Sequence, residues 1–422
     1  MKKILIIGAG ISGLTAAYRL KGQGNTLIKV VESTSTPGGW VQTSLDSQGG
    51  RIEKGPQLVA MQVGTPLHQL FSSLRIPLTI HRNLTRFIGI GGQLIPVPKG
   101  LIEFIKTPIL STKGKIRLLL EPFFNLMLNR KQEYSLEQEI IRRFGSEVGN
   151  RIAPAMINGI LGTNASEVSQ ESLPIFGKSN QRSILLHSIK QPPPILATPK
   201  FGMGHLTAIL AANCDVRYGT KITNLEFDQS QWSVTVNGSI EKYDSVLLAI
   251  SAQESAQLLS SIYPRLSESL ANIEYTSLYL SYSTHSPSKF LQNTLGFLLH
   301  PSESNIILGC FVSSSIDEST HSEKLQLRTF IKAYSVEKPN WNIIYSELLK
   351  WIPDLSPAQY SHIDAAHSGI PKIKIGQLDK INNELKKLPK SIDWIAGARF
   401  GPGVKDIVEG IDRWISTTNN DT

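Results

Sequence analysis

Three glycines near the start of the chain have the spacing that binds the phosphates of a dinucleotide. Gly8, Gly10 and Gly13 form a GxGxxG motif between an apolar run, residues 4–7, and a helical pattern, residues 14–20. In this motif the first glycine permits a tight turn, the second lets the backbone approach a pyrophosphate, and the third lets the helix pack closely on the sheet. The N–H groups that open the helix then face the phosphates. The motif predicts dinucleotide binding.

An acidic residue follows where such a site needs one. A second apolar run, residues 27–31, ends in Glu32. A carboxylate at the end of the second strand accepts hydrogen bonds from the hydroxyl groups of the adenosine ribose. Gly38 and Gly39 then allow a second close approach to a diphosphate. A glycine pair after the acid is more typical of FAD proteins than of NAD proteins, so the sequence favours FAD.

The elements around these residues predict an α/β, Rossmann-like fold. Strand, glycine turn, helix and second strand follow one another in the first 32 residues, and a continuously apolar run at 245–250 predicts a later buried strand of the same sheet. Near the end of the chain an apolar run, residues 392–396, leads into a glycine loop and a helix over 407–416. The N-terminus of that helix would point at the cofactor, where its dipole stabilises negative charge on a reduced flavin.

Composition narrows the class of protein. The chain has 422 residues, 41% apolar residues and 18% charged residues, as expected of a globular protein with a large core. Its net charge of +9 favours anionic partners, but no nucleic-acid module or long basic block is present. The two cysteines indicate a reducing, cytoplasmic location, and the histidines form no metal-binding cluster. Homodimer formation stays open.

Turn and period signals divide the chain into three parts. Hairpin signals at 86–95, a meander with an Asn237-Gly238 turn and strong alternation over 276–335 predict antiparallel sheets. We expect an FAD-binding domain of residues 1–80, 200–250 and 380–422, and an antiparallel-sheet substrate-binding domain of residues 81–95 and 251–379. Residues 96–195 are expected to form a helical insertion.

The helical insertion is both basic and apolar. Between residues 95 and 131 lysines and arginines clearly outnumber acids, and they alternate with leucine, isoleucine and phenylalanine. A basic amphipathic stretch of this kind can lie peripherally in an anionic membrane surface. The alternative is a helical domain whose apolar residues form only its own core. No apolar stretch reaches the length of a membrane-spanning helix.

The motifs together carry a family resemblance over essentially the whole chain. GAGISGL at the start, Glu32, Gly38-Gly39-Trp40 and Gly55-Pro56 resemble flavin-containing amine-oxidase-like proteins, and closely the oxygen-dependent protoporphyrinogen and coproporphyrinogen oxidases. More specific matches are Arg86-Phe87-Ile88, the helical segment 142–176 and Phe201-Gly202-Met203-Gly204. The resemblance implies FAD-dependent oxidation of protoporphyrinogen IX to protoporphyrin IX in heme biosynthesis. Six electrons leave in three two-electron steps, and molecular oxygen is reduced to hydrogen peroxide.

The resemblance also assigns site residues. It places Arg86 at a substrate propionate, which suits the planar guanidinium group, and the backbone of Gly159 beside the macrocycle. Both have structural alternatives: Arg86 as a surface arginine and Gly159 as a helix-packing glycine. The predicted cofactor-binding residues are Gly8, Gly10, Ile11, Ser12, Gly13, Glu32, Gly39, Trp40, Gly55, Pro56, Gln57, Leu58, Ile222, Gly397, Gly403, Val404 and Asp406. No general base stands out.

Several alternatives remain open. Coproporphyrinogen III is the second candidate substrate, because the sequence does not show how many carboxylate groups the substrate carries. A flavin amine oxidase, a carotenoid-type desaturase and a non-catalytic flavin scaffold on anionic lipid are more distant alternatives. The sequence also departs from the family at Gln57, where an arginine is common, and its closing glycine loop is slightly shorter.

Overall fold

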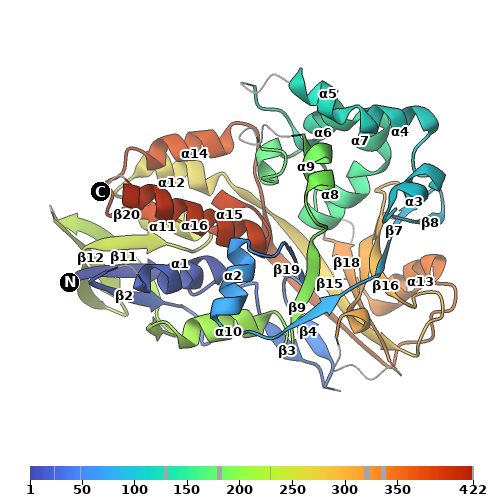
Figure 1. Ribbon diagram of the computed structural model, residues 1–422. Coiled ribbons are helices and arrows are strands. Elements are labelled where there is room, and N and C mark those ends of the chain that lie inside the picture. The colour runs from blue at the N-terminus through green and yellow to red at the C-terminus, as the bar shows by residue number, and fades with distance from the viewer. Residues whose placement is uncertain are drawn as a thin grey trace.

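The computed structural model describes residues 1–22, 24–47, 49–127, 132–177, 183–228, 230–317, 324–333 and 339–420. Figure 1 shows three parts: a parallel sheet with helices at the left, a second sheet at the lower right and a helical insertion above that sheet. Both chain ends lie at the left, in the part with the parallel sheet.

A five-stranded parallel sheet forms the half of the molecule that the sequence predicts to bind the cofactor, called the cofactor-binding half below. Its order is β10 (Val216–Arg217), β2 (Thr26–Val31), β1 (Lys2–Ile7), β14 (Ser245–Leu248) and β20 (Ile392–Trp394). Residues of β1 alternate between two cores, with Ile4 and Ile6 on one face and Leu5 and Ile7 on the other. Helices α1 (Ile11–Lys21), α2 (Pro66–Ser73), α10 (Gly204–Ala212) and α16 (Val404–Asn420) cover the first face. The Rossmann-like fold predicted from the sequence is confirmed.

The opposite face of the parallel sheet packs against helices and a meander. The helices are α11 (Ala252–Leu259), α12 (Pro264–Ala271) and α14 (Gln377–Leu385), and the meander comprises β11 (Ile222–Asp228), β12 (Gln231–Val236) and β13 (Ser239–Tyr243). Asn237 and Gly238 both have positive φ at the β12–β13 turn, as a two-residue hairpin requires. Residues 252–271 fall within the expected substrate-binding part, yet α11 and α12 pack against the cofactor-binding sheet because their buried apolar residues face β14 and β1.

Two smaller sheets line the junction between the halves. One pairs β3 (Thr43–Leu45) with β4 (Arg51–Glu53). The other has the order β5 (Val59–Met61), β9 (Ile195–Pro199) and β6 (Leu78–His81), so the chain that leaves the helical insertion returns beside strands that precede it.

A seven-stranded sheet forms the second half. Its order is β19 (Tyr360–Lys372), β15 (Glu274–His285), β18 (Leu325–Lys332), β17 (Ile307–Val312), β16 (Thr294–Leu299), β7 (Thr85–Ile90) and β8 (Gln93–Pro96). All pairs are antiparallel except β7 with β16, which is parallel. The predicted hairpin is β7–β8. One face packs against α13 (Trp341–Trp351), and the other faces the insertion and the cofactor-binding half.

The insertion is helical, as expected. It contains α3 (Leu101–Lys106), α4 (Thr112–Leu119), α5 (Glu121–Leu126), α6 (Leu136–Phe144), α7 (Ser146–Arg151), α8 (Ala153–Leu161) and α9 (Ile184–Lys190). Its core includes Leu136, Ile140, Ile157 and Leu161. The fully buried Arg143 guanidinium pairs with Glu139 at 2.6 Å, which fixes α6 internally. Among the described residues, every helix is too short or too polar to cross a bilayer.

Candidate functional site

The GxGxxG turn has the geometry that its glycines predict. Gly8 has φ of +105°, and its N–H donates to the carbonyl of Val31 at 2.8 Å. A Cβ atom at Gly13 would lie 2.0 Å from the carbonyl oxygen of Gly8, so α1 can approach β1 only without a side chain there. A Cβ atom at Gly10, by contrast, would meet nothing within 4 Å. The open space therefore lies at Gly10, at the N-terminus of α1, and backbone N–H groups at such a helix N-terminus are suited to bind a phosphate.

Glu32 directly follows β2 and is hydrogen-bonded to the turn of the GxGxxG motif. Its carboxylate accepts hydrogen bonds from the Ala9 N–H at 2.9 Å and from the N–H and hydroxyl of Thr34, both at 2.9 Å. The Gly38 N–H donates to the carbonyl of Ala9 at 2.8 Å. A Cβ at Gly39 would be 3.6 Å from the Cα of Gly10. The turn at Gly8–Gly10, the Gly38-Gly39 pair and Glu32 thus lie around one space, which fits the diphosphate and ribose of FAD.

The C-terminal glycines reach the same place. Gly397 opens the short helix α15 (Gly397–Phe400), and a Cβ there would lie 3.9 Å from the hydroxyl oxygen of Ser12, in the first turn of α1. The Ile395 N–H donates to the carbonyl of Leu248 at 2.9 Å, which aligns this segment with the parallel sheet. The structure thus brings residues at the two ends of the chain together.

Helix α16 begins beside this loop. The Asp406 carboxylate accepts a hydrogen bond from the Gly403 N–H at 3.2 Å, and burial raises the pKa of Asp406 despite that bond. Val404 is buried in the core with Ile407. Val404 can therefore offer only its backbone N–H to a ligand, because its side chain is in the core, while the Gly403 N–H is already used by Asp406.

The predicted residues 55–58 form a second wall. A Cβ at Gly55 would lie 2.2 Å from the carbonyl oxygen of Trp40, and the Trp40 ring in turn lies beside Gly369 of β19. Gln57 is buried, and its side-chain oxygen accepts a hydrogen bond from the Ser313 hydroxyl at 3.2 Å. Pro56 and Leu58 are half-buried. This loop runs between β4 and β5 and contacts the half with the seven-stranded sheet through the bond to Ser313.

Ile222 lies near Glu32, but its side chain is in the core. The Thr220 N–H donates to the carbonyl of Glu32 at 2.8 Å, which places the start of β11 beside β2. The Ile222 side chain packs with Val31 and Val236. Its contribution at the surface of the site is therefore limited to the backbone.

Arg86 and Gly159 lie on the same face of the seven-stranded sheet. Phe87 and Gly89 face the core with α13, so alternation turns Arg86 to the opposite face. Arg86 pairs with Gly296 of β16, and a Cβ at Gly159 in α8 would lie 2.4 Å from Leu298, two residues further along β16. Arg86 is exposed, and within the described ranges it forms no ion pair. Leu280, Leu308 and Phe330 extend this apolar face toward Trp40.

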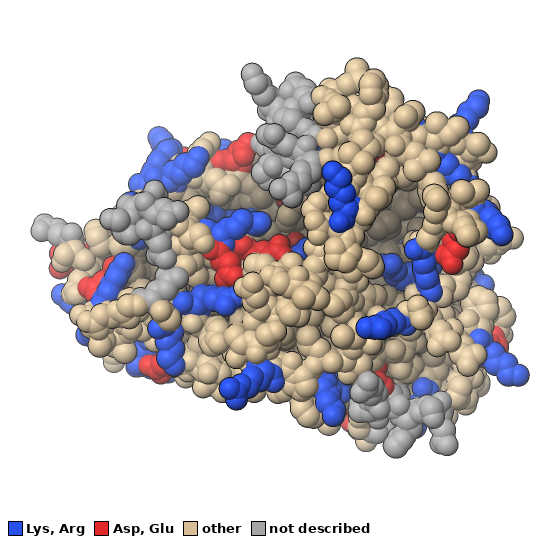
Figure 2. All heavy atoms as spheres, viewed as in Figure 1, with Lys and Arg blue, Asp and Glu red and all other residues tan. Residues whose placement is uncertain are grey.

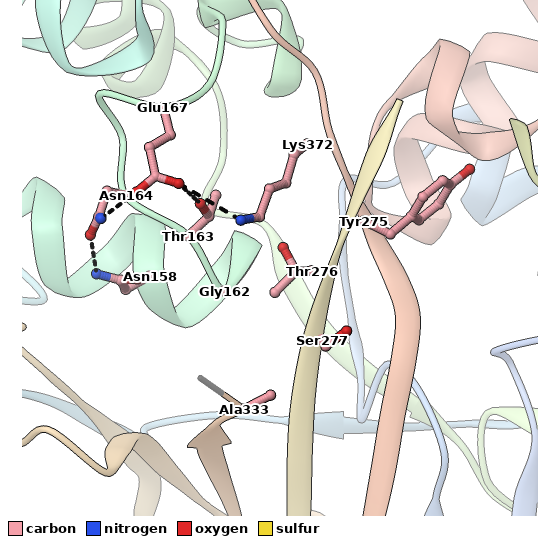
Figure 3. A pocket seen from close by; sticks show the side chains of 10 residues that line it. All are labelled: Asn158, Gly162, Thr163, Asn164, Glu167, Tyr275, Thr276, Ser277, Ala333 and Lys372. Carbon is pink, nitrogen blue, oxygen red and sulfur yellow. Dashed lines mark hydrogen bonds and ion pairs between the residues drawn. The ribbon is translucent and has the colours of Figure 1, made fainter. Parts of the chain in front are cut away.

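A polar cavity of about 550 Å³ lies at the end of α8 (Figure 3). Glu167 links its wall: it accepts from Asn164 at 2.5 Å and Thr163 at 2.9 Å, and lies 3.7 Å from the Lys372 ammonium group. The remaining lining residues are Asn158, Gly162, Tyr275, Thr276, Ser277 and Ala333. None of the predicted site residues lines this cavity, which adjoins Gly159 only through its helix. Five of its lining residues fall within segment 142–176, but the family resemblance of that segment predicted no cavity. The run of small and polar residues after α8 was the one local signal.

Comparisons with known proteins agree with this geometry. The sequence profile of the flavin containing amine oxidoreductase family matches residues 11–335. The chain is 24% identical to coproporphyrinogen III oxidase of Bacillus subtilis, over 97% of this chain and 96% of that protein. It is 23% identical to protoporphyrinogen oxidase of Homo sapiens, over 74% and 73% of the two chains.

Solved structures share the fold. A candidate protoporphyrinogen oxidase from Exiguobacterium sp. 255-15 superimposes with a TM-score of 0.79 at 19% identity, covering 100% of this chain and 99% of that one. Cyclohexylamine oxidase from Brevibacterium oxydans gives a TM-score of 0.75 at 16% identity, covering 99% of each. The open space at Gly10, beside Gly39, fits FAD. Because the family profile spans most of the chain, this protein belongs to the flavin-containing amine oxidoreductases and is an FAD-dependent oxidoreductase.

Proposed function

We propose that this protein oxidises a porphyrinogen to the corresponding porphyrin. The observation that carries the proposal is the exposed Arg86 on a sheet face whose apolar residues reach Trp40, next to the loop 55–58 that is predicted to bind the cofactor. A macrocycle with propionate groups requires an apolar surface for its ring and a cation for a carboxylate. The porphyrinogen oxidases among the relatives support the same reading.

The residues of the chain bind and orient the substrate in this scheme. Arg86 pairs with a propionate, while Leu280, Leu308 and Phe330 exclude water beneath the ring. FAD, when bound, supplies the two-electron redox chemistry. Six hydrogen atoms leave the porphyrinogen in three steps, and three molecules of oxygen become three of hydrogen peroxide.

Protoporphyrinogen IX and coproporphyrinogen III are the two candidate substrates. They differ in the number of propionate groups, two against four. The apolar insertion supports the more lipophilic protoporphyrinogen, whereas the full-length similarity to a coproporphyrinogen III oxidase supports the other. We place protoporphyrinogen first because the surface of the insertion suits a substrate delivered from a lipid phase.

The insertion itself is proposed to dock peripherally on an anionic membrane surface. In α5 the usual burial is inverted, because polar Glu121 and Asn125 are buried while Phe123 and Leu126 are 60% and 84% exposed. Helix α3 has no fully buried residue: Phe104 packs partly against the insertion core, whereas Leu101, Ile102 and Ile105 are exposed. In the region of α4 and α5, at the upper right of Figure 2, uncharged surface predominates, and Lys and Arg lie around it. A large exposed apolar patch with basic margins fits an anionic lipid interface.

Anaerobic mixing of the FAD-loaded protein with each porphyrinogen tests the function. Loss of flavin absorbance near its visible maximum, followed by its return and porphyrin fluorescence when oxygen is admitted, is the expected result. The substrate that bleaches the flavin faster is the preferred one. No bleaching with either porphyrinogen, in a protein that dithionite does reduce, would overturn the proposal.

A further inference from the structure

Three consecutive backbone carbonyls in the cofactor-binding half are held by two side chains of the seven-stranded sheet. The Tyr282 hydroxyl donates to the carbonyl of Glu53 at 3.0 Å. The Arg328 guanidinium donates through Nη2 to the carbonyl of Lys54 at 3.0 Å and through Nη1 to that of Gly55 at 2.5 Å. The held segment leads directly into Pro56 and Gln57.

Tyr282 and Arg328 form one structural unit. They are direct partners in the register of β15 and β18, so they project side by side from the same sheet face. They are 6% and 2% exposed. The guanidinium also lies over the rings of Tyr282 and Phe330, at 5.7 and 5.1 Å from their centres. Burying a guanidinium costs free energy unless its N–H donors form hydrogen bonds. Here Nη1 and Nη2 of Arg328 both donate to adjacent backbone carbonyls, those of Gly55 and Lys54.

The same segment is held from its other side. The Glu53 carboxylate accepts from the Thr43 hydroxyl at 2.7 Å and from the Met203 N–H at 2.9 Å. The Gly204 N–H donates to the Thr43 hydroxyl at 2.8 Å, which extends the network to the start of α10. Beyond the held carbonyls, Gln57 receives its bond from Ser313, just after β17. The loop is thus fixed against both halves of the molecule.

We propose that Tyr282 and Arg328 are positioning residues that hold the Gly55–Gln57 loop in place beside the flavin. The inference rests on the placement of that loop at the flavin, which belongs to the proposed function. The pair joins the sheet that would carry the substrate to the half that binds the cofactor, so it sets the distance between the two. Displacements of about 1 Å at such a site reduce rates by about a hundredfold.

The variants Tyr282→Phe, Arg328→Lys and Arg328→Met test the proposal in the FAD-loaded protein without porphyrinogen. The measurements are the Kd for FAD, the visible circular dichroism of the bound flavin and its midpoint potential. We expect Arg328→Met to raise the Kd for FAD by about tenfold or more, as for the loss of a charged hydrogen bond, and to shift both the spectrum and the potential. Arg328→Lys keeps a positive charge but loses the paired N–H donors of the guanidinium. Its Kd for FAD, spectrum and potential should therefore lie between those of Arg328→Met and of the wild type.

Two control variants separate positioning from general destabilisation. Tyr345→Phe removes a tyrosine hydroxyl that donates to the carbonyl of Leu355 at 3.1 Å, in the core on the other face of the same sheet. Arg143→Met removes a buried arginine in the insertion. Both should lower the melting temperature and leave the flavin spectrum and potential unchanged.

Wild-type spectra and potentials in both Tyr282→Phe and Arg328→Met would overturn the inference. If Arg328→Met does not fold, Tyr282→Phe decides, because it keeps the ring and loses a single hydrogen bond. Since no porphyrinogen is present, failure here is distinct from failure of the bleaching experiment.

Discussion

A Cβ atom on Gly13 would lie 2.0 Å from the carbonyl oxygen of Gly8, whereas one on Gly10 would touch nothing within 4 Å. Gly13→Ala should therefore prevent α1 from packing on β1 and yield unfolded protein. Gly10→Ala should fold, because Gly10 has φ of −74°, but should lose most of its FAD, since the methyl group occupies the space for the phosphate. Melting of the FAD-free protein and fluorescence of released flavin measure the two effects. A Gly10→Ala protein with normal FAD content would contradict this placement of the cofactor.

Gly159 offers a direct choice between packing and substrate contact. The methyl group of Gly159→Ala would lie 2.4 to 3.0 Å from three carbons of Leu298, which should cost about 1–3 kcal/mol of unfolding free energy. Leu298→Ala in the same chain should restore much of that loss. Urea denaturation of the single and double variants measures the coupling. Normal stability with reduced turnover would instead favour the substrate role.

Arg86→Ala should weaken porphyrinogen binding and leave FAD in place. Loss of a charged hydrogen bond costs about 1.5–3 kcal/mol, so KM should rise roughly tenfold to a hundredfold. The KM of Arg86→Lys should lie between those of the wild type and of Arg86→Ala, because lysine keeps the charge without the planar guanidinium group. Steady-state kinetics with bound FAD measured in parallel is the test, and exposed Arg265→Ala on α12 is the matched control. Loss of FAD in Arg86→Ala would contradict a substrate role.

Glu53 should make the stability depend on pH. Burial raises its pKa from 4.5 to about 7, although bonds from Met203 and Thr43 oppose the rise. Between these pH values the folded protein keeps a proton that the unfolded chain releases, so stability should fall by up to about 3 kcal/mol as pH rises from about 4.5 to about 7. Glu53→Gln should flatten this part of the curve, as measured by urea unfolding at several pH values. Exposed Glu268→Gln should retain the slope; an unchanged slope in Glu53→Gln would refute the assignment.

Membrane docking predicts a sharp response to charge on α5. The double variant Phe123→Asp/Leu126→Asp should no longer sediment with vesicles rich in phosphatidylglycerol, while the parent chain should bind them and bind less at high salt. The control Leu45→Asp/Ile240→Asp places the same charges at exposed apolar residues outside the insertion. This variant should bind the vesicles like the parent chain. Equal binding of both double variants would exclude α5 as the contact.

Local signals predicted the parts of the fold that depend on local geometry. The glycine turn, the β7–β8 hairpin and the Asn237-Gly238 turn each follow from the conformational needs of a few adjacent residues. The sequence could not show which face of α5 is buried, because amphipathicity does not say which side meets the protein. Here Glu121 is inside because its carboxylate bonds the start of α9.

Long-range partners could not be predicted. The parallel pairing of β7 with β16 joins segments with no common motif. Arg328 looks like any strand arginine until β18 is placed against the loop after β4, and its bonds to Lys54 and Gly55 span more than half of the chain. The packing of α11 and α12 on the parallel sheet likewise depends on where β14 lies.

Strand β20 and helix α16 lie far along the chain from β1, and this separation sets an order of events during synthesis. Strand β1 is central in the parallel sheet, yet edge strand β20 and the glycine loop at Gly397 are made after all the other strands of that sheet. At about 5–20 residues per second, roughly 20 to 80 s separate the translation of the two. The half that holds the glycine fingerprint therefore cannot mature before the other two parts have been synthesised. The side of the site formed by Gly397 is therefore absent until that residue has been made, and chaperones have that interval to shield the apolar strands.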